Sequence, residues 1–291
     1  MNTFHSNIIN IYGEKGKAWL DALPQLVAAT SSKLDLRDLI EVANLTYNHV
    51  LSGFQSDHSI ILKLGLNHEA LTREAFALRC FEGYGAVKVL AEDDGILLLK
   101  RAVPGRSLKS YFPDKEHESI EIACGVIKKL HQANIPTTHN FPHIKDWLTA
   151  LDKDWNIPKH YLQNARKLRD QLLQTSEADV LLHGDLHHDN ILQNGDDWLV
   201  IDPKGAIGEP SYELAAFIRN PMPELLNHAD VPNIILNRIT HFAKIIELPS
   251  QRIFDWCFVN SVLAWAWALE DGCDSGYWER LVETLNSCSI S

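Results

Sequence analysis

Hydrophobic positions alternate between helical and strand-like spacing along the first hundred residues. From Glu14 to Val27 they recur every three or four positions, which predicts a helix, and the same spacing predicts another over Glu69–Phe81. Runs of apolar and β-branched residues predict strands at 38–42, 47–51, 59–64, 87–90 and 96–99. The last two runs flank Glu92-Asp93-Asp94-Gly95, which is typical of a hairpin turn. A mostly antiparallel sheet with one inserted helix is therefore expected.

The hydrophobic pattern changes after Val103-Pro104-Gly105, where proline and glycine interrupt regular secondary structure. Helical spacing follows at residues 120–130, 162–172 and 254–269, and the last segment is apolar nearly all round, so it is expected to be buried. We predict an α+β fold of two lobes. Residues 1–102 would form a small antiparallel β-rich lobe with an N-terminal helix, and residues 103–291 a larger, mainly α-helical lobe.

Composition narrows the class of protein. The chain has 291 residues, 45% of them hydrophobic, and 27 basic against 38 acidic residues give a net charge of −11, which argues against a nucleic-acid or anionic-membrane partner. Its five cysteines are widely spaced and include no Cys-x-x-Cys, so neither a disulfide framework nor a structural zinc site is expected. With no signal-peptide or membrane-span pattern, a cytoplasmic protein is predicted, of an oligomeric state that the sequence does not indicate.

The densest cluster of polar residues lies in the middle of the chain. Asn194-Gly195, between two apolar runs, predicts a hairpin. That hairpin would bring Asn190, just before its first strand, close to Asp202, just after its second. Asp185 precedes Asn190 by five positions in a polar loop. One short segment can therefore gather two carboxylates and an amide.

Phosphoryl transfer from ATP requires such a set. One carboxylate orients the attacking hydroxyl, while an asparagine and a second carboxylate hold Mg²⁺. The order His183-x-Asp185, then Asn190, then Asp202 agrees with the kinase signature. Kinases also need a strand lysine paired with a helix glutamate to bind the ATP phosphates, and Lys63 and Glu74 meet that requirement.

The motifs HGDLHHDNIL and WLVIDPKGAIGEP resemble the aminoglycoside phosphotransferase family, which has a protein-kinase-like fold. They are most similar to its streptomycin 6-phosphotransferase and hydroxyurea phosphotransferase branch. The resemblance extends from about residue 38 to the C-terminal helices and is tightest over 181–210. It implies that Asp185 is the catalytic base, that Asn190 and Asp202 bind Mg²⁺, and that Asp202-Pro203-Lys204-Gly205 is the family's Asp-Pro-x-Gly variant.

The resemblance also implies contacts to ATP outside this segment. The backbone of residues 99–102, including Leu99 and Arg101, would bind adenine. No Gly-x-Gly-x-x-Gly precedes Lys63, and the candidate phosphate loop is residues 44–48, which ends at Asn48. Family members often use a polar, asparagine-containing turn at that place.

The implied acceptor is a hydroxyl-bearing small molecule, such as the cationic aminoglycoside streptomycin, which would make the protein a resistance enzyme. Glu270, Asp271 and Asp274 would attract such a cation, although acidic runs are usually solvated surface. Two alternative functions are compatible with the same nucleotide-binding residues. One is a metabolic kinase of the choline, homoserine, methylthioribose or sugar type, and the other is a non-catalytic nucleotide-binding module.

Several residues have a simpler structural interpretation. We expect Glu213 to support the catalytic loop from a helix start, His183 to pack that loop, and the tryptophans at 256, 265 and 267 to belong to the core. His187 and His188 are expected to be loop residues, one of them near the phosphates, and Lys204 to contact either a phosphate or solvent. A metallohydrolase centre built on these histidines would instead predict bound zinc and activity without ATP.

Overall fold

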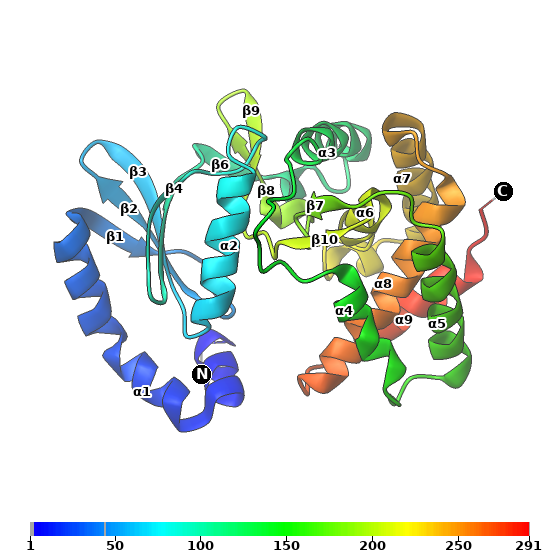
Figure 1. Ribbon diagram of the computed structural model, residues 1–291, viewed down its shortest axis with the longest axis horizontal. Helices are drawn as coiled ribbons and strands as arrows, with labels where there is room; N and C mark the ends of the chain where they lie inside the picture. The colour runs from blue at the N-terminus through cyan, green and yellow to red at the C-terminus, as the bar shows by residue number, and fades with distance from the viewer. Residues whose placement is uncertain (1–2, 44, 291) are drawn as a thin grey trace. The chain divides into compact units, whose positions relative to one another are not determined.

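The computed structural model describes residues 3–43 and 45–290, and these residues form two compact units. The first comprises the described residues up to Glu82 together with Val87–Val103. The second comprises Gly83–Ala86 and the described residues from Pro104 onward. Each unit has its own sheet or sheets and its own helices (Figure 1). The nucleotide-binding role expected of residues 1–102 and the catalytic role expected of 103–291 stay predictions.

The first unit is built on one antiparallel sheet of five strands in the order β1-β2-β3-β5-β4 (Figure 1). The strands are β1 Leu36–Glu41, β2 His49–Gln55, β3 His58–Leu64, β4 Val89–Asp93 and β5 Ile96–Lys100. The predicted antiparallel sheet is confirmed, and all five strands lie within a few residues of the expected runs. Lys63 is on the central strand, where it pairs with Val50 of β2 and Leu97 of β5.

Two helices accompany this sheet. Helix α2, His68–Cys80, begins where the Asn67 side chain accepts a hydrogen bond from the Ala70 N–H, and it confirms the second predicted helix. Helix α1, Thr3–Leu34, consists of two helical segments joined at Gly13, which has φ 57° and ψ −131°. The second segment confirms the predicted helix 14–27 and continues to Leu34, and the first segment was not predicted. Glycine adopts this conformation without steric cost, so the break ends the first segment.

The second unit is mainly helical. Its α-helices are α3 Glu116–Leu130, α4 Ile144–Leu148, α5 Lys159–Gln174, α6 Pro210–Ile218, α7 Val231–Ile246, α8 Ser250–Glu270 and α9 Gly276–Ser287. The helices predicted at 120–130, 162–172 and 254–269 are confirmed as α3, α5 and α8, and the middle of α8 is buried as expected. None of the helices described is both long and apolar enough to cross a membrane.

Short strands and 3₁₀ turns complete the second unit. Strands β6 Pro104–Ser107, β8 Ile191–Asn194 and β9 Asp197–Val200 form one sheet, and β7 Val180–Leu182 pairs with β10 Ala206–Gly208. The predicted hairpin is confirmed as β8–β9. The single 3₁₀ turns are η1 Leu108–Tyr111, η2 Thr149–Asp152, η3 His188–Asn190 and η4 Glu224–Asn227.

A buried arginine fixes the end of α6. Arg238 on α7 is fully buried, and its Nη1 donates to the carbonyls of Phe217, Ile218 and Asn220, at the C-terminal end of α6 and just after it. Its Nε and Nη2 donate to the two carboxylate oxygens of Glu116 on α3, at 2.7 and 2.8 Å. One guanidinium therefore joins three helices.

We expect Arg238→Met to lower the free energy of unfolding by about 3–5 kcal/mol, because it leaves buried carbonyls and a carboxylate without a donor. Glu116→Gln leaves the contacts between Arg238 and the three carbonyls in place, so it should lower the free energy of unfolding by a smaller amount. Urea denaturation measures both values. A midpoint for Arg238→Met equal to that of the unmodified chain would contradict this account of α6.

Candidate active site

The polar segment predicted to carry the chemistry lies between β7 and β10. His183 at its start is fully buried, and its Nε2 lies 2.8 Å from the Ile201 carbonyl, to which it donates. Its own carbonyl accepts hydrogen bonds from the N–H groups of Lys204 and Gly205, at 2.8 and 3.2 Å. Burial lowers the pKa of this imidazole, so it is neutral. The expected packing role of His183 is confirmed.

Glu213, in the first turn of α6, holds the start of the loop. Its carboxylate accepts hydrogen bonds from the backbone N–H groups of His183 and Gly184, at 2.6 and 2.9 Å. Gly184 has φ 82°, and a Cβ there would lie 2.9 Å from the Trp147 ring. The loop is therefore fixed on both sides, and the supporting role expected of Glu213 is confirmed.

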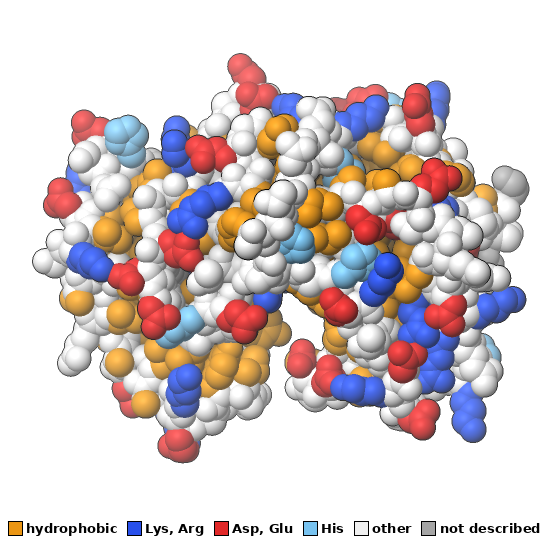
Figure 2. Space-filling view, in the orientation of Figure 1, with side chains coloured by type: hydrophobic (Ala, Val, Ile, Leu, Met, Phe, Trp, Pro, Cys, Tyr) orange, Lys and Arg blue, Asp and Glu red, His pale blue; other side chains and the backbone are white. Residues whose placement is uncertain are grey.

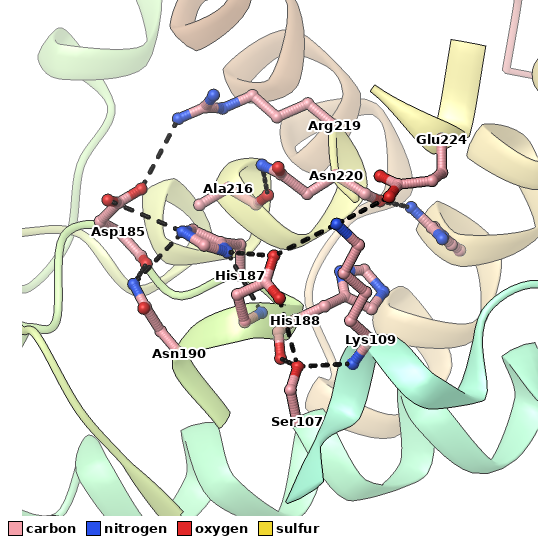
Figure 3. A network of polar contacts seen from close by, with 12 residues as sticks. Ser107, Lys109, Asp185, His187, His188, Asn190, Ala216, Arg219, Asn220 and Glu224 are labelled. Atoms are coloured by element: carbon pink, nitrogen blue, oxygen red, sulfur yellow. Dashed lines mark hydrogen bonds and ion pairs between the residues drawn. The ribbon is translucent and has the colours of Figure 1, made fainter. Parts of the chain in front are cut away.

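Asp185 follows this turn, and its carboxylate lies among positive groups (Figure 3). One oxygen lies 3.9 Å from Arg219 Nη2 and the other 3.9 Å from His187 Nε2, while 29% of the side chain is exposed. Burial acts to raise the pKa of Asp185, but electrostatic interactions with His187, Lys204 and Arg219 outweigh it, and the pKa is lowered. The carboxylate is therefore ionised at neutral pH.

The β8–β9 hairpin brings the two predicted metal ligands to one end. The Ile201 N–H donates to the Asn190 carbonyl at 3.1 Å, so Asp202 follows directly beside Asn190 in the fold. The Asn190 Nδ2 donates to the Asp185 carbonyl at 2.9 Å, and Oδ1 accepts no hydrogen bond from the residues described. Asp202 has a left-handed φ of 59°. An amide oxygen and a carboxylate are donors that Mg²⁺ prefers, so the residues present fit this ion.

The two remaining histidines have different surroundings. His188 is buried and stacks on Phe217 at 3.9 Å, and burial lowers its pKa well below the ordinary range, so it is neutral. His187 Nε2 lies 3.3 Å from the Asn190 side-chain amide (Figure 3). Within residues 3–43 and 45–290, no three or more His, Cys, Asp or Glu side chains are arranged to hold a metal ion, so the cluster required by the metallohydrolase alternative is not formed there.

Lys63 and Glu74 form a pair within the first unit. Lys63 Nζ lies 2.8 Å from both carboxylate oxygens of Glu74, and their side chains are only 6% and 9% exposed. Lys63 projects from β3 to the face of the sheet that α2 covers, since its neighbours Leu62 and Leu64 point into the core on the other face. The predicted pairing is confirmed, and the ammonium is held in a defined place.

The other predicted nucleotide contacts lie in the same unit. Leu99 is buried on β5, and the Arg101 N–H already donates to the Ser59 carbonyl at 3.0 Å, so that group is not available to adenine. The Asn48 side chain lies against Gly65, where an added Cβ would collide with its Oδ1. Asn44, at the start of the expected phosphate loop, lies outside the described residues.

Sequence reasoning missed Arg219, the residue that follows α6. Its guanidinium lies 4.9 Å from the Trp278 ring centroid, and its carbonyl accepts a hydrogen bond from the Tyr277 hydroxyl at 2.7 Å. Its buried Nε has no hydrogen-bond partner in the described part of the chain. Helix α9 thus holds a guanidinium beside Asp185. No local pattern signals this contact, because the two residues meet only through the tertiary fold.

One of the three acidic residues expected to attract a cation, at the end of α8 and just after it, already has a basic partner. Glu270 pairs with Lys153 Nζ at 2.6 Å, while Asp271 and Asp274 are exposed. Figure 2 shows acidic side chains beside a basic one at the C-terminal end of α8. Trp256 and Trp265 are buried in the core as expected, whereas Trp267 is half-buried against Trp147.

Relatives of known activity share much of this chain. The streptomycin 6-kinase of Streptomyces glaucescens is 26% identical over 275 residues, which cover 90% of this chain and 88% of that protein. The streptomycin 3''-kinase of Klebsiella pneumoniae is 29% identical over 202 residues, covering 67% of this chain and 74% of that protein.

The fold is also that of solved phosphotransferases. A thermostable mutant of the aminoglycoside phosphotransferase APH(4)-Ia, solved with ADP and hygromycin B, superposes with a TM-score of 0.68 at 14% identity, covering 91% of this chain and 99% of that one. This likeness confirms the predicted α+β kinase-like fold. The model of the aminoglycoside/hydroxyurea antibiotic resistance kinase family matches residues 50–272. Since this match spans most of the chain, the protein belongs to that family.

Proposed function

We propose that this protein transfers the γ-phosphoryl group of ATP to a hydroxyl group of a streptomycin-like aminoglycoside, with Mg²⁺ as cofactor. The observation that carries the proposal is the hairpin-closed segment that gathers Asp185, Asn190 and Asp202 at one end of β8–β9. Membership of a kinase family supports the reaction type. The names of two relatives, a streptomycin 6-kinase and a streptomycin 3''-kinase, support the acceptor.

Asp185 is the residue that handles the acceptor hydroxyl. Its carboxylate is ionised and partly exposed, so it accepts a hydrogen bond from the hydroxyl and orients the oxygen toward the γ-phosphorus. The acceptor oxygen forms a bond to phosphorus, the bond to the ADP oxygen breaks, and the hydroxyl proton passes to Asp185. A carboxylate of lowered pKa is a weak base, so it takes the proton late in the phosphoryl transfer. The main contribution of Asp185 is therefore to position the acceptor hydroxyl.

Asn190 and Asp202 hold Mg²⁺, through an amide oxygen and a carboxylate respectively. The ion, when bound, neutralises the negative charge of the phosphates. The Asn190 amide is oriented for this by its donation to the Asp185 carbonyl, which links the metal ligand to the base through one hydrogen bond. His183 and Glu213 act on both residues indirectly, since they fix the loop.

Lys63 binds the α- and β-phosphates of ATP, and Glu74 positions it. A buried ammonium that keeps a carboxylate partner is fixed in direction, which lowers the entropic cost of binding the phosphates. Residues 99–102 supply backbone groups for adenine, with the Arg101 N–H excluded because Ser59 already uses it. The loop that ends at Asn48 lies over the phosphates.

The choice of acceptor is tested by ADP release from Mg-ATP with a panel of hydroxyl compounds. Streptomycin should stimulate ADP release well above hydroxyurea, choline, homoserine and methylthioribose. Turnover with one of these metabolites and none with streptomycin would keep the kinase chemistry but refute the aminoglycoside acceptor. Binding of ATP without turnover on any acceptor would instead favour the non-catalytic module.

Asp185→Asn should lower kcat by about 10²–10⁴-fold, because the neutral amide orients the acceptor hydroxyl less strongly than the carboxylate and cannot take its proton, while affinity for ATP stays unchanged. Asp196→Asn, an exposed acid in the turn of the same hairpin, is the matched control and should keep full activity. Steady-state kinetics and calorimetric ATP binding measure the two properties. A folded Asp185→Asn variant with unchanged kcat would disprove the assigned role.

Glu74→Gln should lower kcat/KM for ATP by about tenfold or more, since a difference of about 1.4 kcal/mol in holding Lys63 is enough for that factor. Glu69→Gln on the same helix removes an exposed carboxylate, 3.4 Å from Arg73, and should change nothing. Equal kcat/KM for ATP in the two variants would argue against a positioning role for Glu74.

A further inference from the structure

The N-terminal part of α1 precedes the residues matched by the family model, which begin at residue 50. The turn at Gly13 folds the first helical segment back against the second, because a Cβ at Gly16 would lie only 2.6 Å from the Ile8 carbonyl oxygen. In a continuous helix, residues eight apart are separated by about 12 Å. Figure 1 shows the two segments of α1 meeting at this bend.

The first segment is packed into the core of its unit. Phe4 and Ile8 are 1% and 0% exposed, and they share one hydrophobic cluster with Leu45, Leu51 and Leu62. The Phe4 ring also lies 6.1 Å from the Trp19 ring. On the surface of the same helical segment, Ile11 is 54% exposed. The start of α1 is thus a fixed part of the first unit.

This segment contacts the loop that precedes β2. The Asn7 side-chain Nδ2 donates to the Thr46 carbonyl at 3.1 Å, across 39 positions of sequence. On either side of Thr46, Leu45 is buried in the shared cluster and Asn48 lies against Gly65 at the end of β3. Three contacts, from α1, from the core and from β3, therefore define the path of residues 45–48.

The Asn7 side chain contacts residues 45–48 from the face of the sheet opposite to the one that carries Lys63. Leu62 and Leu64 point into the cluster that contains Phe4, so Lys63, which lies between them, projects to the other face. Asn7 therefore has no direct route to the ammonium that would bind the ATP phosphates. Any influence it has on the nucleotide must pass through the loop.

We propose that Asn7 is a positioning residue for ATP: its amide holds the Thr46 carbonyl and thereby orients residues 45–48 toward the phosphates. The inference rests on the proposed function, since it takes this loop as a phosphate contact. The Thr46 side chain is exposed, so its carbonyl bond to Asn7 ties this position to the core of the first unit. The start of α1 thus sets the affinity for ATP without touching it.

Asn7→Asp tests this directly, because aspartate has the same shape but cannot donate, and its charge repels the Thr46 carbonyl. Asn10→Asp is the matched control. Asn10 is exposed and lies about one turn further along the same helical segment, and its replacement by aspartate adds the same charge. Calorimetry gives Kd for Mg-ATP, steady-state kinetics with saturating streptomycin give kcat and KM, and thermal melting gives Tm.

Asn7→Asp should raise Kd and KM for ATP about tenfold, with kcat and the streptomycin KM nearly unchanged, and Asn10→Asp should match the unmodified chain. Equal ATP affinity in the two variants overturns the proposal. A parallel loss of Tm, kcat and ATP affinity in Asn7→Asp also overturns it, because that pattern is a general loss of structure. Failure of the proposed function is distinguishable because it shows in the unmodified chain, as absent turnover with streptomycin or absent Mg-ATP binding. The comparison of Kd between the two variants stands as long as the unmodified chain binds Mg-ATP.

Discussion

The backbone hydrogen bond from Ile201 to the Asn190 carbonyl fixes where chemistry can occur in the second unit. It closes the β8–β9 hairpin, so that residues separated by eleven positions in the chain become neighbours. Asn190 in turn donates to the Asp185 carbonyl, and His183 donates to the carbonyl of Ile201. Two carboxylates and an amide are thus brought to one end of the hairpin by these contacts.

Charge is distributed differently inside this site and outside it. Buried ions elsewhere are closely paired, as Lys63 is with Glu74 at 2.8 Å and Arg238 with Glu116 at 2.7 Å. Around Asp185 the contacts lengthen to 3.9 Å, and Arg219 Nε has no partner among the residues described. Leaving charged groups without close partners lowers stability, and it is a recognised feature of functional sites. A phosphate or an acceptor hydroxyl would supply the missing contacts.

The sequence predicted those parts of the fold and site that depend on neighbouring residues. The hairpin followed from Asn194-Gly195, and the pairing of Lys63 with Glu74 followed from a strand and the helix after it. The helix expected at 14–27 is the second segment of α1, whereas the first segment, before Gly13, was not predicted. A helix start was expected at Glu213, but the extent of α6 was not, because its residues are buried on all sides and no helical period is visible. Arg219 and Asn7 act across tertiary contacts that no local pattern encodes.

The central claim is that the hairpin end carries a metal site formed by Asn190 and Asp202. Mn²⁺, a spectroscopic substitute for Mg²⁺, can be titrated into the protein with ADP and followed by electron paramagnetic resonance. We expect tight nucleotide-dependent Mn²⁺ binding by the unmodified chain and at least a tenfold weaker affinity in Asp202→Asn, on the order expected when a charged ligand is replaced by a neutral amide. Equal Mn²⁺ affinity in the two proteins would contradict it.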